Sequence, residues 1–326
     1  MRALATIDKI VDVKPIEGAD NIEVARVRDW HVVVRKNEFR VGDTCVYFEI
    51  DTMLPVEDTR FEFLANRGVK TNNNGFKGHV LKTIKLRGTV SQGLVLPIAE
   101  FPELRGMSIG QDVTDKLGVQ KWEPPMEFIP FNPSTAKPRP QFVPKTDEER
   151  IQNVGYLVDA MNSQWTVTEK IDGTSVSAYW HPVLGIGVCS RNYEVADEDG
   201  NLYWDIVKKY DLHAHMASEW PDKTVVIQGE LYGPKVQGNP LGVPTRQLAV
   251  FNVIVDGAYL PMDEWPEWVV PVPQVMMPIP DSVEKALADV DGLRSVISPQ
   301  RLAEGVVWRK WPMSFKVINN KFLLKG

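Results

Sequence analysis

The stretch TEKIDGTS, at residues 168–175, decides how the second half of the chain is interpreted. Lys170 ends a strand-type run, QWTVTEK, and the turn residues Asp172 and Gly173 follow almost at once. A lysine in this position projects its amine from the edge of a sheet, and the glycine lets a ligand approach the backbone closely. These residues alone leave two interpretations open, a solvated surface charge and a nucleophile.

A nucleophilic lysine must lose its proton, and its ordinary pKa of about 10.4 keeps the amine protonated at neutral pH. Burial and nearby cations both lower the pKa of a lysine. If Lys170 is a nucleophile, we therefore expect other cationic side chains or metal ions beside it.

Strand-type and helix-type stretches alternate in the second half of the chain. Thr146 and Glu149 have the spacing of a capping box, and apolar residues recur from Ile151 to Met161, so a helix is expected there. Further helix-type stretches lie at 204–220 and 281–297, and strand-type runs lie at 224–230, 248–255, 305–310 and 314–320. The pattern predicts an α+β domain built on antiparallel sheet.

The first hundred residues contain short β-type runs separated by turn residues. The runs are IEVARV, HVVVRK, TCVYFEI, HVLKTIKL and QGLVLPI. Their spacing suits a five-stranded OB-type barrel, and it leaves an SH3-like barrel or a sandwich open. One stretch, residues 70–88, carries only basic charges, which suits either contact with a phosphodiester backbone or a solvated hairpin; its basic residues are Lys70, Lys77, Lys82, Lys85 and Arg87.

A proline-rich segment separates the two patterns. Its sequence, KWEPPMEFIPFNPSTAKPRPQFVPK, excludes a regular helix or a central strand because proline fixes φ and lacks an N–H group. We therefore expect an OB-like accessory domain at 1–118, a linker at 119–145 and a catalytic domain at 146–326.

Composition limits the possible partners and location. The 326 residues carry a formal net charge of -6, which argues against non-specific coating of nucleic acid but allows a local basic groove. The N-terminus has no signal-peptide core, and proline interrupts the most apolar run, so no membrane partner is expected. Cys45 and Cys189 form no C-x-x-C pair, and we expect a reducing, cytoplasmic location.

Five further motifs follow the K-x-D-G of residues 170–173 in a fixed order. They are SRNYE at 190–194, IQGELYG at 227–233, LAVFNVIVDG at 248–257, AEGVVWRK at 303–310 and SFKVINNKF at 314–322. In this order they resemble the motifs of the covalent nucleotidyltransferase superfamily, which contains ATP-dependent ligases and capping enzymes. A surface lysine would not require such a set downstream.

The resemblance implies a chemical role for each motif at the phosphates of ATP. Lys170 becomes the nucleophile that carries AMP, Glu304 the carboxylate that organises Mg²⁺ or Mn²⁺, and Lys316 the cation on the α-phosphate. Many relatives carry K-x-K in the last motif, whereas Ile318 replaces the second lysine here, and Lys321 and Lys325 remain candidates for a second cation.

The same resemblance implies the residues around the nucleoside. Arg191 would contact the nucleotide and the incoming 5′-phosphate, Glu230 the ribose hydroxyls, and Phe251 would stack on adenine. Glu169 and Ile171, which flank the lysine, would complete the ATP site.

The resemblance extends over nearly the whole chain. Residues NEFRVGDTCVYFEIDTMLP, LKTIKLRGTVSQGLVLP and TDEERIQN are similar to an ATP-dependent RNA ligase family that joins an N-terminal OB domain to a minimal adenylyltransferase domain. The chain stops just after its last motif, which agrees with an accessory module on the N-terminal side. The family implies a monomer that seals 3′-OH/5′-phosphate nicks in a duplex with RNA on the 3′-OH side.

Two alternatives remain open. The first is a DNA ligase or a capping-type nucleotidyltransferase. The second is a non-catalytic nucleic-acid-binding protein that uses its OB fold.

Overall fold

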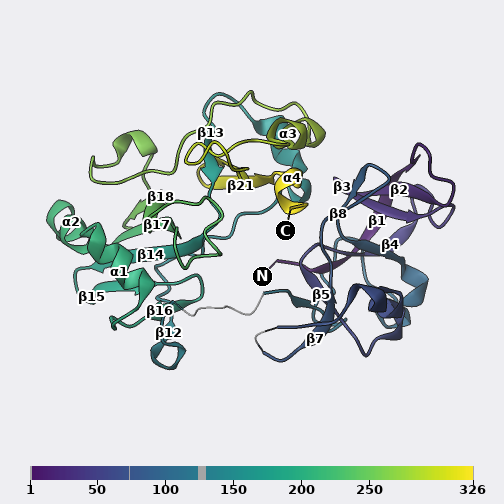
Figure 1. Ribbon diagram of the computed structural model, residues 1–326, viewed down its shortest axis with the longest axis horizontal. Coiled ribbons are helices and arrows are strands. Elements are labelled where there is room, and N and C mark those ends of the chain that lie inside the picture. Colours follow the sequence, from purple (N-terminus) through teal and green to yellow (C-terminus); the bar gives the residue numbers. More distant parts are fainter. Residues whose placement is uncertain (1, 73, 124–129, 326) are drawn as a thin grey trace. The chain divides into compact units, whose positions relative to one another are not determined.

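The computed structural model of the chain describes residues 2–72, 74–123 and 130–325. It divides into two compact units, which are described separately (Figure 1). The first unit comprises Met1–Met126 with Leu323–Gly326, and the second comprises Glu127–Phe322. Residues 124–129 of the expected linker lie outside the described residues, and the domain boundaries stay a prediction.

The first unit is built from strands, as the sequence predicts. Its strands are β1 (Ala5–Pro15), β2 (Ile22–Val27), β3 (Trp30–Arg35), β4 (Thr44–Phe48), β5 (Thr52–Pro55), β6 (Lys70–Thr71), β7 (Lys77–Val80), β8 (Ile84–Leu86), β9 (Thr89–Ser91), β10 (Leu94–Pro97) and β11 (Gln120–Lys121). A five-stranded antiparallel sheet has the order β10-β4-β1-β2-β3, and a second sheet has the order β11-β5-β7-β6. The strands β8 and β9 form a separate hairpin.

Both faces of strand β4 are covered by hydrophobic side chains. Val46 and Phe48 point to one core, whereas Cys45 and Tyr47 point to another, as expected from the period of two in a strand. Phe48 packs edge-on against Phe61, with 5.4 Å between ring centroids. The sheet is therefore an internal layer of this unit.

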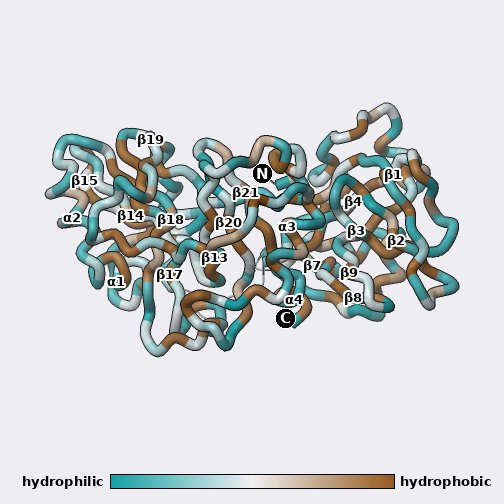
Figure 2. The backbone as a smooth tube through the Cα atoms, turned by 90° about the horizontal axis from the view of Figure 1, so that it is seen from above, coloured by the Kyte–Doolittle hydropathy of each residue, from teal (hydrophilic) through white to brown (hydrophobic). Residues whose placement is uncertain are grey.

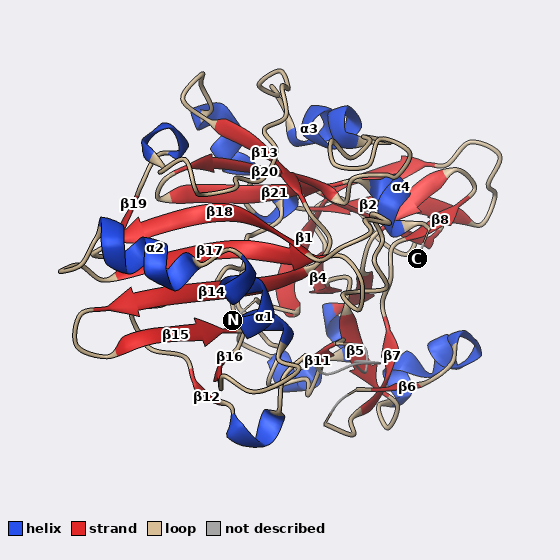
Figure 3. Cartoon of the chain, turned by 60° about the vertical axis from the view of Figure 1, so that its left-hand side comes forward, coloured by secondary structure: helices blue, strands red, loops and turns tan. Residues whose placement is uncertain are grey.

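The second unit contains a large and a small antiparallel sheet. The large sheet has the order β12-β16-β15-β14-β17-β18-β19, and the small sheet has the order β13-β20-β21. The strands are β12 (Lys137–Pro138), β13 (Thr166–Lys170), β14 (Thr174–His181), β15 (Gly185–Cys189), β16 (Tyr193–Val195), β17 (Val225–Tyr232), β18 (Gln247–Val255), β19 (Ala258–Tyr259), β20 (Gly305–Lys310) and β21 (Met313–Ile318). This arrangement confirms the predicted antiparallel α+β class, and Figure 3 shows how strands dominate it.

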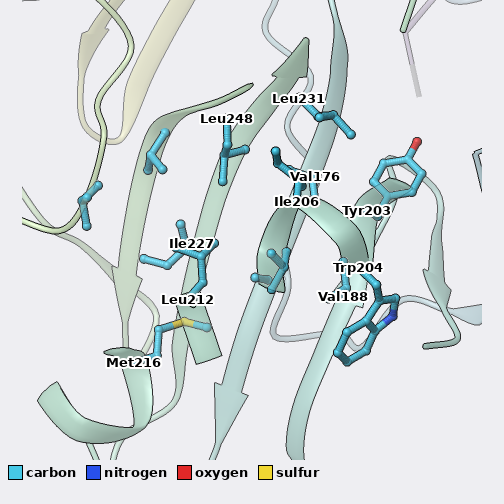
Figure 4. Packing of buried hydrophobic residues seen from close by; sticks show 14 of the residues in the cluster. Val176, Val188, Tyr203, Trp204, Ile206, Leu212, Met216, Ile227, Leu231 and Leu248 are labelled. Carbon is cyan, nitrogen blue, oxygen red and sulfur yellow. The ribbon is translucent and has the colours of Figure 1, made fainter. Parts of the chain in front are cut away.

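Helices α1 (Leu202–Lys209) and α2 (Leu212–Glu219) cover the large sheet. Trp204, Ile206 and Met216 pack against strand residues such as Val188 and Ile227 (Figure 4). The sequence pattern over 204–220 indicated one helical stretch, but Asp211 adopts a left-handed conformation with φ 47° and separates two helices.

The small sheet forms its own core with α3 (Val283–Val290). Trp165, Trp308 and Phe315 are buried between the sheet and the neighbouring turns. Figure 2 shows hydrophobic residues recurring along the strands, while many connections are hydrophilic. The remaining helical elements are α4 (Asn320–Leu323) and the 3-10 turns Thr59–Arg67, Ile98–Glu100, Pro102–Leu104, Pro133–Thr135, Ile151–Asn153, Gly155–Ala160 and Met262–Glu264.

The α-helix expected over residues 146–161 is wrong. The segment instead begins extended and ends in two 3-10 turns. Thr146 does not cap a helix, because its hydroxyl lies 2.8 Å from that of Ser175, and the Glu149 carbonyl accepts a hydrogen bond from the Lys316 N–H at 2.7 Å. Contacts with the two sheets have overridden the local helical pattern.

The described part of the proline-rich segment contains only a 3-10 turn and short strands, and no α-helix or central strand, as expected from its prolines. Lys137–Pro138 forms the edge strand β12, where a missing N–H group is tolerated. Cys45 and Cys189 are both buried and free of disulfides. None of the helices in the described residues has the length and apolar character needed to cross a bilayer.

Candidate functional site

The register of the small sheet places Lys170 beside Glu304. Lys170 ends β13 and lies opposite Gly305, the first residue of β20. Its Nζ therefore reaches Oε2 of Glu304, at 2.6 Å, although 134 positions separate the two in sequence. Both side chains are partly buried, with 26% and 18% exposed. Because β13 pairs with β20, two motifs that are distant in sequence contribute the two partners of one ion pair.

Gly173 brings the turn after Lys170 against β17. A Cβ atom at this position would collide with the carbonyl oxygen of Leu231 and lie 3.0 Å from Cγ of Glu230. The sequence suggested that this glycine allows a ligand to approach, and the structure shows a close approach to a neighbouring strand. The absence of a side chain at Gly173 allows the turn after Lys170 to lie directly against Leu231 and Glu230.

We predict that Gly173→Ala lowers stability by about 1–3 kcal/mol, because the added methyl group meets backbone that cannot move away easily. The midpoint of thermal unfolding should fall by about 2–4 °C for each kcal/mol. Gly185→Ala is the control, since a Cβ at Gly185 meets nothing within 4 Å and tests only its φ of +77°. An unfolding midpoint of Gly173→Ala equal to that of the unmodified chain would contradict the close approach at Gly173, and the midpoint of Gly185→Ala gives the cost of a strained φ alone.

Carboxylates dominate the electrostatics around Lys170. Burial by itself lowers the pKa of the Lys170 amine, but Glu304, Glu230 and Asp172 outweigh it and raise the pKa. Burial raises the pKa of Glu230 to about 8, against the opposing effect of Lys170, and burial together with Glu304 raises that of Asp172 to about 6. The carboxyl groups of Glu304, Glu230 and Asp172 thus all act on the ammonium group of Lys170.

This environment differs from the one expected for a nucleophilic lysine. The sequence argument expected cationic side chains or metal ions beside Lys170, whereas the side chains that raise the pKa of its amine are the acidic Glu304, Glu230 and Asp172. The protein alone therefore favours the ammonium form. The excess of carboxylates over cations also makes the site chemically suited to a divalent metal ion.

The donor set fits a metal ion that is shared with a substrate. Among the described residues, no group of three or more histidine, cysteine or acidic side chains forms a complete metal cage. Mg²⁺ in nucleotide enzymes is usually held by one or two carboxylates plus water and substrate phosphates. Glu304, with Glu230 or Asp172 beside it, fits that arrangement.

Lys316 lies on the same face of the small sheet as Lys170. In the ladder Thr168 is opposite Val307, and Val307 is opposite Lys316, so these side chains point the same way as that of Lys170, two positions after Thr168. The variable position Ile318 is 3% exposed and packs into the protein. A lysine at position 318 would place its charge in this buried environment, where a charge is unfavourable without a partner.

Glu169 lies on the opposite side of β13 from Lys170, and Ile171 directly follows the strand. Glu169 is 2% exposed; its Oε2 accepts a hydrogen bond from the Val296 N–H at 2.8 Å, and Oε1 has no hydrogen-bond partner among the described residues. Burial raises the pKa of this carboxyl group. Ile171 belongs to a small hydrophobic cluster against which Phe251 and Ile297 pack.

Arg309 contacts this region and was missed by the sequence argument. Its Cζ lies 5.5 Å from the centroid of the Phe251 ring, and Nη1 donates to the Thr168 hydroxyl at 2.8 Å. Nη2 pairs with Glu148 at 3.2 Å, and Glu148 also accepts a hydrogen bond from Ser314. The signal was present in the WRK of residues 308–310, whose basic residues were not assigned a role.

Arg191 is brought to the segment that precedes the 3-10 turns. Its Nη2 pairs with Asp147 at 2.5 Å, and both side chains are exposed. Arg139, from the proline-rich segment, donates to the carbonyls of Ser190 and Arg191 at 2.5 and 3.1 Å. The backbone of Arg191 is thus held by Arg139, a residue to which the sequence argument assigned no role.

Two family models match the chain. One, described as an OB-fold domain, matches residues 4–98, and the other, described as RNA ligase, matches residues 163–325, where all the residues around Lys170 lie. The chain belongs to the RNA ligase family. The match to the first model confirms the predicted OB-type fold, and the second confirms the predicted enzyme class.

Solved structures of Naegleria gruberi RNA ligase are similar to this RNA ligase over its whole length. A glutamate-to-alanine variant with AMP and Mn is 32% identical, with a TM-score of 0.91 and coverage of 100% of this chain and 99% of that one. A lysine-to-alanine variant with ATP and Mn is also 32% identical, with a TM-score of 0.90 and 99% coverage of both chains. A third structure, with PPi, is 32% identical, with a TM-score of 0.88 and coverage of 99% and 98%. The comparison with curated proteins finds no match.

Proposed function

We propose that this RNA ligase uses ATP to seal 3′-OH/5′-phosphate nicks in duplexes with RNA on the 3′-OH side. The observation that carries the proposal is the 2.6 Å contact between Lys170 and Glu304, made inside a cluster that also includes Glu230 and Asp172. Similar structures of the Naegleria ligase with ATP, AMP and Mn support the choice of nucleotide. The RNA requirement comes from the family resemblance of the whole chain.

Lys170 is the nucleophile of the first step. After its ammonium loses a proton to solvent, Nζ forms a bond to the α-phosphorus of ATP, and the bond between that phosphorus and the pyrophosphate oxygen breaks. Lys316, on the same face of the sheet, stabilises the charge that develops on the α-phosphate. The AMP then passes to the 5′-phosphate of the nick, and attack by the 3′-OH releases it.

The carboxylates around Lys170 would hold the divalent cation. Glu304 would supply a ligand, and water and the phosphates of ATP would supply others. When bound, Mg²⁺ or Mn²⁺ offsets the carboxylate charge that keeps Lys170 protonated and neutralises charge on the triphosphate.

The nucleoside lies against the small cluster on the other side of β13. Phe251 offers an aromatic face for adenine, and Ile171 is packed beside it. The buried Oε1 of Glu169, which lacks a hydrogen-bond partner among the described residues, can accept a hydrogen bond from the adenine amino group. The Glu230 carboxyl group holds the ribose. Arg191 receives the 5′-phosphate of the nick after leaving Asp147.

The substrate assignment is tested with two nicked duplexes that differ only in the sugar of the 3′-OH strand. With ATP and Mg²⁺, we expect the RNA strand to be sealed at least about tenfold faster than the DNA strand, because a contact to the 2′-hydroxyl is lost in the latter. The measurement is the rate of joining in single-turnover conditions. GTP replaces ATP in a parallel series and should support no joining.

Each alternative predicts another result. Equal rates on the two duplexes would favour a DNA ligase, and transfer of GMP would favour a capping-type enzyme. Binding of the duplexes without any joining would favour a non-catalytic protein. Light scattering in the same buffer should give the mass of one 36.8 kDa chain, because we expect a monomer.

A further inference from the structure

One segment of the first unit has a charge balance opposite to that of the chain. The chain has 43 acidic and 37 basic residues, yet residues 67–88 contain six basic residues and no acidic one. The six are Arg67, Lys70, Lys77, Lys82, Lys85 and Arg87. From Phe63 to Ala99 no aspartate or glutamate occurs at all. This local excess of positive charge has no role in the chemistry at Lys170.

The fold gathers three of these cations around one cavity. A cavity of about 260 Å³, open to solvent, is lined by Arg67, Gly68, Lys70, Val80, Lys82 and Ile84. The lining residues come from the end of the 3-10 turn Thr59–Arg67, from β6, and from the segment joining β7 to β8. The sequence analysis included Lys70 and Lys82 in the basic stretch, but only the fold shows that Arg67 lies at the same cavity.

The backbone around the cavity is fixed by contacts inside the same unit. Lys70 pairs with Gly78 in the β6–β7 ladder. The ring of the buried His79 places Nδ1 3.0 Å from the Gly68 carbonyl oxygen. The cations therefore extend from a supported frame, with their own side chains exposed to solvent.

The cations of the cavity lack carboxylate partners in the described part of the chain. Within residues 2–72, 74–123 and 130–325, no carboxylate forms an ion pair with Arg67, Lys70 or Lys82. Lys70 has an aromatic neighbour instead, since its Nζ lies 5.7 Å from the centroid of the Trp122 ring. Three unpaired cations beside an aromatic ring and two aliphatic side chains match an anionic polymer whose bases or sugars also make contact.

We propose that this cavity binds the phosphodiester backbone of the RNA substrate. The inference rests on the proposed ligase function, and it adds a substrate contact that lies apart from the ATP chemistry. Arg67, Lys70 and Lys82 bind consecutive phosphates, and Trp122 flanks the strand. An open cavity suits this role because a bound strand is longer than the cavity and has to extend out of it in both directions.

The test uses the full chain with Arg67, Lys70 and Lys82 all changed to alanine. Binding of a fluorescent nicked RNA duplex is measured at several salt concentrations. Each lost phosphate contact should reduce the slope of log K against log salt by about 1, so we expect a reduction of about 2–3 and at least about tenfold weaker binding at 0.1 M salt. The same duplex made of DNA distinguishes contact with phosphates alone from contact that needs ribose.

Two further variants control for charge and folding. Changing Lys14, Lys36 and Arg40 to alanine removes the same charge from exposed positions of the same unit and should leave binding unchanged within about twofold. A variant with Arg67→Lys, Lys70→Arg and Lys82→Arg keeps every charge and should retain binding.

Transfer of label from ATP to Lys170 separates this proposal from the proposed function. The alanine variant should form the lysyl-AMP adduct as the unmodified chain does, while its sealing of nicked RNA declines. An unchanged salt slope, or adduct formation lost together with binding, would overturn the cavity assignment. Failure of the unmodified chain to form an adduct would instead contradict the ATP-dependent function. The salt dependence of RNA binding would still test the cavity assignment in that case.

Discussion

Lys170→Ala is expected to abolish the transfer of label from α-labelled ATP to the protein, with a loss of at least about 10³-fold. Alanine offers no atom that can form the bond to phosphorus. The variant should still join a strand whose 5′ end already carries AMP, since that reaction begins after the lysine has acted. The measurement is the radioactivity that stays with the denatured protein, together with the joining rate on the pre-adenylylated strand.

The matched control for this variant is Lys208→Ala. Lys208 is an exposed lysine that pairs with Asp197 at 2.5 Å, and its loss should leave the labelling unchanged. Labelling that survives in Lys170→Ala would show that another residue is the nucleophile. Loss of joining on both substrates would point to a damaged fold, which the unfolding midpoint detects.

Glu304→Gln is expected to slow adduct formation by at least about 10²-fold, which is the scale found when a preorganised electrostatic group is removed. Two effects of this change oppose each other. Loss of the negative charge beside Lys170 lowers the pKa of the amine and would by itself favour the nucleophilic form. Loss of the carboxylate also removes a ligand for the divalent cation, and we expect this effect to dominate.

The direction in which the rate of adduct formation changes in Glu304→Gln therefore separates the two effects. A rate that rises in Glu304→Gln would mean that the carboxylate acts on Lys170 alone. A rate that falls, and that partly recovers at higher Mn²⁺ concentration, would agree with a metal ligand. Asp197→Asn is the control, because it removes an exposed carboxylate that pairs with Lys208. The rates are measured by single-turnover labelling over a range of metal concentrations.

The positions of Lys170, Glu230 and Lys316 on strands, and of Glu304 directly before one, could be predicted because each motif contains a strand-type run. Strand alternation is a local property, so the sequence reports it directly. Their convergence could not be predicted from the pattern alone, since it depends on the register between β13 and β20 and on the close approach at Gly173. The family resemblance supplied that information.

Residues 146–161 show why a local pattern fails. The segment has a capping-box spacing and an apolar period of helical type, yet Glu148 and Glu149 make contacts with the small sheet instead. Gly155 lies in the middle of the apolar stretch and lowers its helical propensity. Arg309 and Arg139 were missed for the same reason, because their partners are distant in sequence.

The alternation of Glu169 and Lys170 along β13 makes the length of this strand more important than its composition. Removing or adding one residue between Thr166 and Glu169 would exchange the two side chains between opposite sides of the sheet. The lysine would then enter the buried environment of the glutamate, and the glutamate would face Glu304. Insertions and deletions are therefore far more damaging here than substitutions of the apolar residue Val167, and natural variation in this strand should preserve its length.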